Sequence, residues 1–223
     1  MIRYLFLLSI FLSLSCSHKA VVERTTYFPK RIETMSNNLK KEYVWVFIMA
    51  GQSNMAGRGI VEPQDTVPDK RILSINEKGQ IIIAKEPLHF YEPERTGLDC
   101  GVSFAKTLIK KIPGNVSILI IPTAVGGSSI SQWLNDSVYR NVKLFSNFLE
   151  KVEISKQNGI IKGILWHQGE SDANEMNIPL HKQRLHLLFS KFRTVIGNNE
   201  LPVLLGELGS FSNNPADFSL INK

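Results

Sequence analysis

The sequence holds only two cysteines, Cys16 and Cys100, among its 223 residues. Two are too few for the disulfide framework of small secreted domains, and if Cys16 carries a lipid no intramolecular disulfide forms. Cys100 is then expected to be a small buried hydrophobe and not a nucleophile. The sequence also lacks a basic stripe with interleaved aromatic residues, although its formal net charge is +6. Nucleic-acid binding is therefore not expected.

Residues 1–15 lack the length of a membrane span but have the pattern of a signal peptide. Arg3 precedes the apolar run YLFLLSIFLSL at residues 4–14, which is shorter than the roughly 20 residues that cross a bilayer. The small residue before Cys16 resembles a bacterial lipoprotein signal, in which the cysteine becomes the lipidated first residue. Ser13 departs from that signal, because it stands where an aliphatic residue is usual.

These features predict an exported protein. We expect a periplasmic or outer-membrane lipoprotein held by a lipid on Cys16, or otherwise a secreted protein, with membrane contact only through that anchor. Residues 16–42 are polar, irregular and rich in lysine, which predicts a tether. Residues 43–223 then form one domain, because the chain is 43% hydrophobic and long enough for a substantial core.

Continuous apolar runs in this domain predict strands buried on both faces. They are YVWVFIMA (43–50), NVSILIIPTA (115–124) and GIIKGILW (159–166), with a further strand at LPVLLGEL (201–208). Two shorter runs, RILSI and QIIIA, flank residues 76–79 and predict a hairpin or a strand with an excursion.

Amphipathic spacing predicts the helices that alternate with these strands. One helix is expected over 102–112, and another carries Val138, Val142, Phe145, Leu149 and Val152 on one face. A third begins near Pro179 and carries Leu185, Leu188, Phe192 and Val195; NNPADFSLINK (213–223) is typical of a helix start. The alternation predicts parallel βαβ units, and hence a three-layer α/β/α sandwich with an open parallel sheet.

Three of the strands end in unusual polar or glycine-rich turns: GQSNMAG (51–57), VGGSSISQW (125–133) and HQGESDA (167–173). Sites in an open parallel sheet form outside the carboxyl ends of the strands, so the three turns are expected to meet. Ordinary structure remains the alternative for each, namely a strand-to-helix turn, a tight glycine turn and a capping amide.

Together the turns carry the groups that acyl transfer needs. Ser53 has a hydroxyl exposed at a turn, as a nucleophile requires. Candidate donors to a tetrahedral oxyanion are the Ser53 N–H at a helix start, an N–H of Gly126 or Gly127, and the side-chain amide of Gln168.

GQSNMAG, GGSSISQW and WHQGESDA resemble the SGNH-hydrolase group that contains sialate O-acetylesterases and acetylxylan esterases. The resemblance runs from about Tyr43 to the C-terminus. It implies Ser53 as nucleophile and an oxyanion hole of the Ser53 N–H, a glycine of the Gly126–Gly127 pair and Gln168. It also implies removal of acetyl groups from sialic acid or from plant or bacterial polysaccharide, without metal or cofactor.

The general base of this family is a histidine late in the chain, three residues after its orienting aspartate. No aspartate of this sequence has a histidine at that spacing. His18 falls in the tether, and His181 and His186 are expected to face solvent on the helix near Pro179. His89 stands in a loop where it can line a pocket, and His167 points away from the site if Gln168 points into it. No general base is therefore found.

Four other polar residues of the turns are candidates for sugar contacts or for orienting a histidine. They are Gln52, Asn54, Glu170 and Asp172, with loop capping the alternative for Asp172.

Three functions remain open. The first is a carbohydrate O-acetylesterase, in a chain expected to be incomplete at its C-terminus and to lack the last helix and the catalytic loop. The second is a non-catalytic descendant that binds acetylated glycans. The third, an SGNH lipase, is disfavoured because that branch usually has GDS and an asparagine where this chain has GQSN and HQGE.

Overall fold

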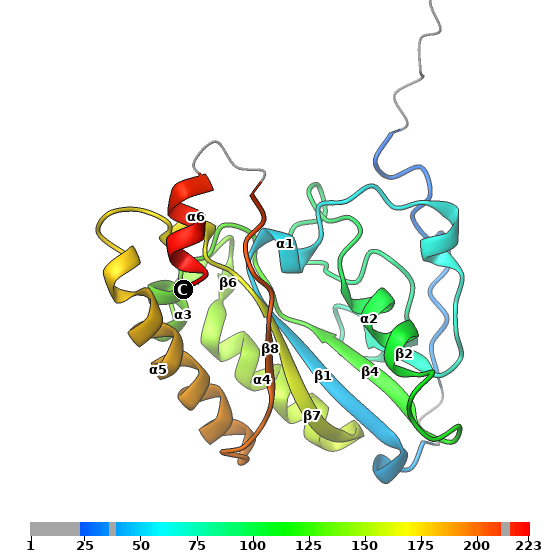
Figure 1. Cartoon of the computed structure of the whole chain (residues 1–223). Coiled ribbons are helices and arrows are strands. Elements are labelled where there is room, and N and C mark those ends of the chain that lie inside the picture. Colours follow the sequence, from blue (N-terminus) through cyan, green and yellow to red (C-terminus); the bar gives the residue numbers. More distant parts are fainter. Residues whose placement is uncertain (1–22, 36–38, 211–214) are drawn as a thin grey trace, which may run out of the picture.

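A six-stranded sheet forms the centre of the computed structural model, which describes residues 23–35, 39–210 and 215–223 (Figure 1). The predicted signal peptide, Cys16 and His18 lie outside these residues, so the predictions about export and lipidation stay predictions. The described helices include none that is both long and apolar enough to cross a membrane.

The sheet has the strand order β3-β2-β4-β1-β7-β8. All neighbours are parallel except β3, which forms an antiparallel hairpin with β2. The strands are β1 (Val44–Gly51), β2 (Ile72–Ile75), β3 (Ile81–Ile83), β4 (Ser117–Pro122), β7 (Ile160–His167) and β8 (Val203–Leu205). Each apolar run that predicts a strand in residues 43–223 therefore contains one.

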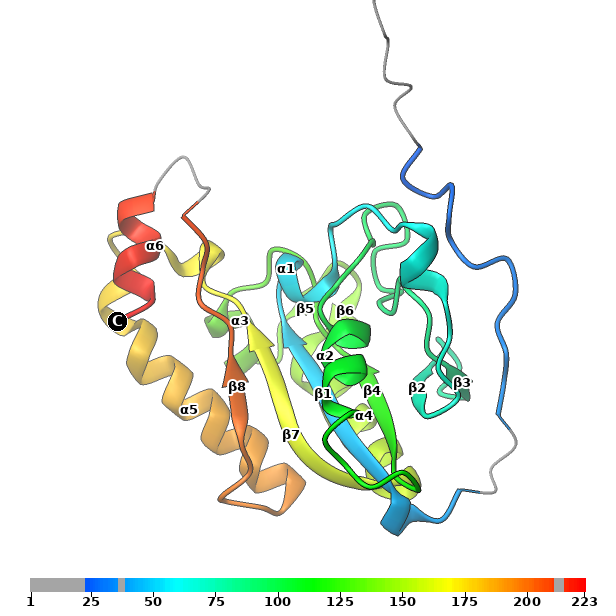
Figure 2. The same ribbon diagram turned by 45° about the vertical axis from the view of Figure 1, so that its right-hand side comes forward.

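Helices cover both faces of the sheet, which confirms the predicted α/β sandwich (Figure 2). On one face lies α2 (Gly101–Leu108), and on the other lie α3 (Ile130–Leu134), α4 (Leu144–Asn158) and α5 (Ile178–Ile196). A four-residue helix, α1 (Ser53–Ala56), follows β1, and α6 (Pro215–Ile221) packs beside α5. Short 3-10 turns occupy Lys41–Tyr43, Pro63–Thr66 and Glu170–Asp172.

A cluster of aromatic rings fills the core between the sheet and the helices α3, α4 and α5. Trp133, Trp166, Phe148 and Phe192 are all fully buried. The rings of Phe148 and Phe192 stack with centroids 4.0 Å apart, and the two tryptophans meet edge to face at 5.7 Å. Because Trp133 is the last residue of the second polar turn and Trp166 directly precedes the third, this core also holds those two turns in place.

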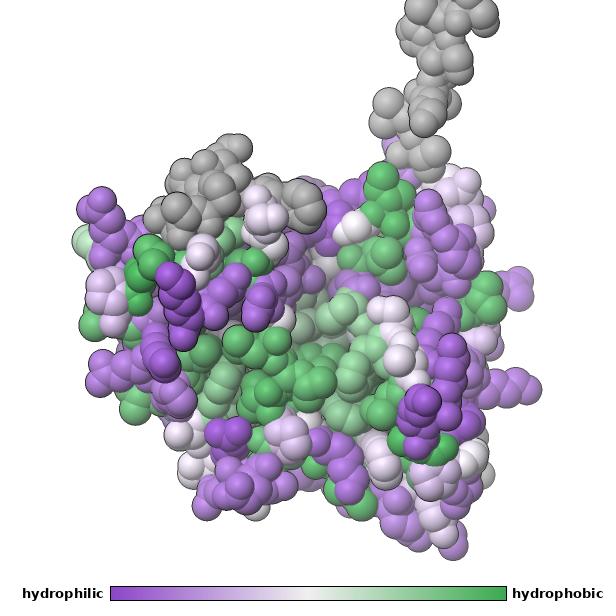
Figure 3. Space-filling model, viewed as in Figure 1, coloured by the Kyte–Doolittle hydropathy of each residue, from purple (hydrophilic) through white to green (hydrophobic). Residues whose placement is uncertain are grey.

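On the opposite face of the sheet, α2 packs on β2 and β4, and its Phe104 meets Phe47 of β1 edge to face at 4.9 Å. In the described part of the chain, no other helix lies over β1, β7 and β8 on this side, and Figure 3 shows an apolar surface there. Leu204 of β8, which pairs in register with Leu165, is 45% exposed.

The predicted helix through Val138 and Val142 is wrong at its start. These two valines lie in a separate hairpin, β5 (Val138–Tyr139) and β6 (Val142–Lys143), and α4 begins only at Leu144. Arg140 and Asn141 form the turn with φ values of 47° and 62°. Both values are left-handed, which suits a two-residue hairpin and breaks a helix. The apolar spacing of four and three residues runs across this break, so it does not mark where the helix begins.

Part of the expected tether is paired with the sheet. Thr34 bridges Ile82 of the edge strand β3, and the Met35 N–H donates to the Ile81 carbonyl at 3.0 Å. Lys85 and Glu33 add an ion pair of 2.6 Å. Residues 33–35 therefore lie along the edge of the domain, inside the segment for which the sequence predicts irregular structure.

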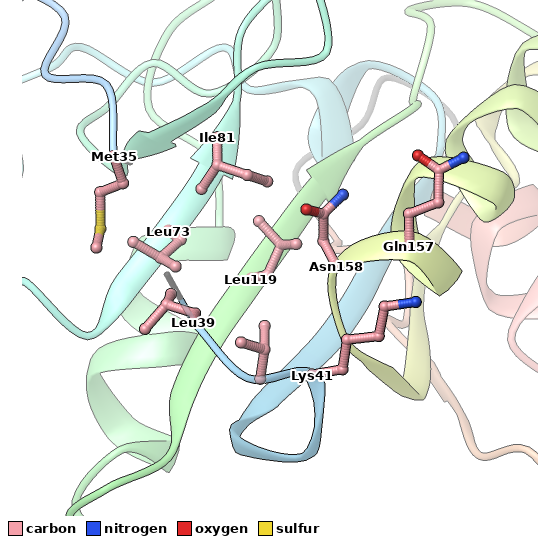
Figure 4. Close-up of a pocket in the computed structure, with 9 residues that line it drawn as sticks. Met35, Leu39, Lys41, Leu73, Ile81, Leu119, Gln157 and Asn158 are labelled. Carbon is pink, nitrogen blue, oxygen red and sulfur yellow. The ribbon is translucent and has the colours of Figure 1, made fainter. Parts of the chain in front are cut away.

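A cavity of about 150 Å³ opens at the amino end of β1, whereas the polar turns lie at the carboxyl ends of the strands (Figure 4). Apolar side chains of Met35, Leu73, Ile81 and Leu119 line one part of it, and the amides of Gln157 and Asn158 line another. Sites of open α/β sheets form at the carboxyl ends of the strands, so we assign no reaction to this cavity.

The aromatic core predicts a large effect of truncating Phe192. Phe192→Ala removes a fully buried ring and is expected to lower the free energy of unfolding by about 3–5 kcal/mol, measured by urea denaturation. Leu187→Ala on the same helix is the control, because Leu187 is 54% exposed, and its effect is expected to stay within about 0.5 kcal/mol. Equal effects of the two substitutions would contradict this description of the core.

Candidate active site

Hydrogen bonds tie the three polar turns to one another at the carboxyl ends of β1, β4 and β7. The Ser171 N–H donates to Gln52 Oε1 at 3.2 Å, and the Ser171 hydroxyl donates to the Gly127 carbonyl at 3.0 Å. Asn54 Nδ2 donates to Glu170 Oε1 at 2.5 Å. One residue of the third turn thus links the other two, and the structure brings together the segments that the sequence predicted to meet.

Ser53 lies at the first position of α1, immediately after β1. Its side chain is half-buried, and within the described residues neither its hydroxyl nor its N–H makes a hydrogen bond. Gly51 allows the chain to turn here, because a Cβ at this position would lie 2.2 Å from the His167 carbonyl oxygen. The backbone of β1 therefore approaches β7 closely and presents Ser53 beyond the end of the sheet.

The two glycines of the second turn differ in their bonding. The Gly126 N–H donates to Glu92 Oε2 at 2.6 Å, and its carbonyl accepts from Arg140 Nε at 2.8 Å. The Gly127 N–H has no acceptor in the described ranges, and its φ of 84° is one that glycine adopts readily. The sequence alone leaves the oxyanion donor open between Gly126 and Gly127.

Gln168 is buried, and its amide is already engaged. Nε2 donates to Asp172 Oδ2 at 2.5 Å and to the Ser128 carbonyl at 3.3 Å. Asp172 Oδ2 also accepts the N–H of Ile130, the first residue of α3, at 2.9 Å. Asp172 thus caps and joins the second and third turns. The role of Gln168 as an oxyanion donor stays a prediction, and it requires the amide to turn away from these acceptors.

No histidine hydrogen bonds to Ser53 among the described residues. His167 Nε2 lies 3.1 Å from the carbonyl oxygen of Glu207, beyond β8, and His186 is exposed on α5. His89 lies in the wall of a groove beside residues 28–32, but its side chain is only 2% exposed. The structure thus identifies no base for Ser53 among the described residues, and the lack of one in this chain stays a prediction.

The imidazole of His89 is held from both sides. Nδ1 lies 3.0 Å from Asp99 Oδ2, and the Ala124 N–H donates to Nε2 at 3.3 Å. Because Nε2 accepts, the Nδ1–H donates to Asp99, which assigns the neutral tautomer. His89 therefore supports the chain that leaves β4 toward the glycine turn.

The prediction that His181 faces solvent is wrong. His181 is 7% exposed, and its burial lowers its pKa, although Asp172 nearby opposes this shift. It lies seven residues before the buried Leu188 and eleven before Phe192, so it shares their face of α5. The spacing that placed Leu185, Leu188 and Phe192 in the core also predicts this burial, had it been extended by one turn.

The prediction that Cys100 is a buried hydrophobe is also wrong, since the residue as a whole is exposed. Its thiol nevertheless packs 3.7 Å from the Met55 sulfur, and desolvation there, with the neighbouring Asp99, raises its pKa to about 11. The thiol stays protonated near neutral pH, which makes it a weak nucleophile.

The described residues include no cluster of three or more His, Cys, Asp and Glu side chains that is suited to a metal ion. Sequence reasoning missed three charged residues at the glycine turn: Arg58, Glu92 and Arg140. Arg58 directly follows the first motif, but Glu92 and Arg140 come from distant parts of the chain, so spacing carries no signal for them.

The fold is that of the SGNH-like carbohydrate esterases. A solved structure of an Arabidopsis thaliana protein, AT4G34215, is 26% identical, with a TM-score of 0.68 over 78% of each chain. The crystal structure of NanS has a TM-score of 0.65 at 21% identity, over 81% of this chain and 73% of that one. At that identity the second likeness concerns the fold alone.

The family follows from the sequence match. The family of carbohydrate esterases described as sialic acid-specific acetylesterase matches residues 43–223, so this chain belongs to it. The curated "Probable carbohydrate esterase At4g34215" of Arabidopsis thaliana is 32% identical over 152 residues. That match covers 59% of this chain and 56% of the relative, so the chain spans little more than half of that protein.

A buried carboxyl group next to the site predicts a dependence of stability on pH. Glu86 accepts the N–H groups of Val102 and Asp99 at 3.3 and 3.4 Å. Burial, and then the Asp99 carboxylate, raise its pKa well above the ordinary 4.5. Above about pH 4.5 the unfolded chain loses the proton of Glu86 while the folded chain keeps it. The stability that is present at low pH is therefore lost as the pH rises toward the folded pKa.

Glu86→Gln mimics the protonated group and is expected to remove this loss. The free energy of unfolding of the variant relative to the original chain should therefore grow from pH 5 upward, by up to about 1.4 kcal/mol per pH unit until the folded pKa is reached. Urea denaturation between pH 5 and 8 measures it, with Glu94→Gln at an exposed position as control. A difference that stays constant over this range would contradict the assignment.

Proposed function

We propose that this chain is a serine esterase that removes O-acetyl groups from carbohydrate, with Ser53 as the nucleophile. Its membership of a carbohydrate esterase family supports the reaction class. The observation that carries the proposal is the position of Ser53, whose hydroxyl and N–H form no hydrogen bond in the described chain, beside a glycine turn joined to it through Ser171. A free hydroxyl with backbone donors nearby suits acyl transfer.

The proposed reaction has two steps. Ser53 Oγ bonds to the acetyl carbon and gives its proton to a general base, while the carbonyl oxygen becomes an oxyanion held by backbone N–H groups. The bond from the acetyl carbon to the sugar oxygen then breaks, and the sugar oxygen takes the proton. Water attacks acetyl-Ser53 in the same way and releases acetate. Gln168 is the proposed third donor, once its amide leaves Asp172.

The alternative is a protein that binds acetylated glycans without cleaving them. It is favoured by one observation, the lack of a histidine bonded to Ser53 among the described residues. Without its base, a serine site keeps only the residual catalysis of the oxyanion hole and substrate binding, about 10³–10⁴ over water. We therefore expect this chain alone to hydrolyse aryl acetates very slowly.

The proposed substrates are O-acetylated sialic acids and acetylated plant or bacterial polysaccharides. The family description names sialic acid, whereas the Arabidopsis relative is named only for carbohydrate. We also propose that the protein is exported, with a lipid on Cys16 as its one membrane contact, and that it needs neither a metal nor a cofactor. Gln52, Asn54, Glu170 and Asp172 are proposed to contact the sugar or to orient the base.

Added imidazole tests whether Ser53 is a nucleophile that lacks only its base. We expect imidazole to raise hydrolysis of p-nitrophenyl acetate by at least about 10-fold, a part of the roughly 10²–10⁴ that a positioned base contributes. Ser53→Ala is expected to abolish this gain, after subtraction of the reaction of imidazole alone. Ser103→Ala, at an exposed serine of α2, is the control and should keep it.

Acetate release from O-acetylated sialic acid and from acetylxylan oligosaccharides then separates the two substrate classes. Imidazole-dependent turnover that persists in Ser53→Ala would overturn the nucleophile. Binding of acetylated glycans without acetate release at any imidazole concentration would favour the binding protein instead.

A further inference from the structure

A buried carboxylate lies between two arginines beside the glycine turn. Glu92, whose side chain is 6% exposed, forms an ion pair of 2.8 Å with Arg58 through Oε2 and one of 3.3 Å with Arg140 through Oε1. The arginine side chains are 27% and 34% exposed. A carboxylate so covered is stable only when paired and hydrogen bonded. We call these residues the Arg58–Glu92–Arg140 triad.

The triad holds both ends of one residue, Gly126. Glu92 Oε2 accepts the Gly126 N–H at 2.6 Å, and Arg140 Nε donates to the Gly126 carbonyl at 2.8 Å. Both bonds involve a charged group, and such bonds are short and strong. A Cβ on Gly126 would lie 1.9 Å from Arg58 Nη2 and 2.6 Å from Glu92 Oε2, so a larger residue would displace these side chains. The N–H of Gly126 therefore already has its acceptor, Glu92, within the protein.

The hydrogen bond from Arg140 to the Gly126 carbonyl also sets the direction of the Gly127 N–H. In a trans peptide the carbonyl of one residue and the N–H of the next point in opposite directions. Arg140 draws the Gly126 carbonyl to itself, so the N–H of Gly127 points away from Arg140. That N–H has no acceptor among the described residues, and the Gly127 carbonyl is bonded to Ser171 in the third turn.

The geometry points to the Gly127 N–H, and not that of Gly126, as the oxyanion donor of this turn, with Glu92 and Arg140 as its positioning residues. This inference rests on the proposed function of Ser53. The hairpin of β5 and β6 positions Arg140, which lies in its tight turn and hydrogen bonds to Gly126 from there. Neither positioning residue is required to touch the substrate.

Amide NMR can test the two glycines separately. Val125–Gly126 is the only Val-Gly step of the sequence and Gly126–Gly127 the only Gly-Gly step. Glycine labelled with ¹⁵N, together with carbonyl-¹³C valine or glycine, therefore selects one amide at a time. In the free protein we expect the Gly126 proton to resonate downfield and to exchange with solvent at least about 10-fold more slowly than that of Gly127.

Reaction with diethyl p-nitrophenyl phosphate, in the presence of imidazole, then fills the oxyanion position. Ser53 Oγ bonds to phosphorus, p-nitrophenolate leaves, and imidazole takes the serine proton. We expect the Gly127 amide proton to move downfield in this adduct while that of Gly126 stays in place. Movement of Gly126 with Gly127 unchanged would overturn the inference, whereas failure to label Ser53 would count against the proposed function.

Variants test the positioning role. Arg140→Gln is expected to lower the rate of Ser53 phosphorylation by at least about 10-fold and to shift the Gly127 amide in the free protein. Arg140→Lys should restore part of the rate, and Arg95→Gln, which removes an exposed charge from the same region, should leave it within about twofold. Glu92→Gln should speed exchange of the Gly126 amide. If the Gly127 amide shift stayed unchanged in Arg140→Gln and the Gly126 exchange rate stayed unchanged in Glu92→Gln, the positioning role of these two residues would be refuted. This outcome would hold even if Ser53 proved unreactive.

Discussion

Strand β1 is hydrogen bonded to β4 on one side and to β7 on the other, with Met49 opposite Pro122 and Gly51 opposite His167. Because the pairing is parallel on both sides, the carboxyl ends of the three strands lie at the same end of the sheet. The turns that follow them must therefore share the same space. The close approach at Gly51 tightens this arrangement, since any side chain there would separate β1 from β7. The bonds among the three turns depend on this register.

Most of the sheet was predictable because its strands are buried on both faces, and such strands appear in the sequence as unbroken apolar runs. The meeting of the three turns followed from the same pattern. Amphipathic spacing was less reliable, since it cannot detect a turn with positive φ, and so the hairpin at Arg140 and Asn141 was predicted as helix. His181 lies on the buried side of α5 because of its spacing from Leu188, although its neighbours Lys182 and Arg184 are charged and favour a position in solvent.

The residues around Gly126 could not be predicted, for a different reason. Glu92 is thirty-four residues from both Arg58 and Gly126 along the chain, and neither periodicity nor a local motif connects them. Only the folded chain shows that this carboxylate is covered and that it holds one peptide group of the site. The motifs thus identified the groups able to react, whereas the groups that orient them came from loops without a recognisable pattern. This division is common where function depends on loops carried by a regular sheet.

The two edges of the sheet are treated differently. At β3, residues 33–35 pair with the outer strand, so its backbone groups are partly satisfied by the chain's own N-terminal segment. At β8, Leu204 and Leu205 are 45% and 50% exposed. An exposed strand edge with apolar side chains is a template for pairing with another molecule. A shortened protein that begins at Val44 would lack residues 33–35 and would therefore expose the outer strands at both edges of the sheet, β3 as well as β8. Such a protein would be less soluble than the longer chain, because either exposed strand could pair with another molecule.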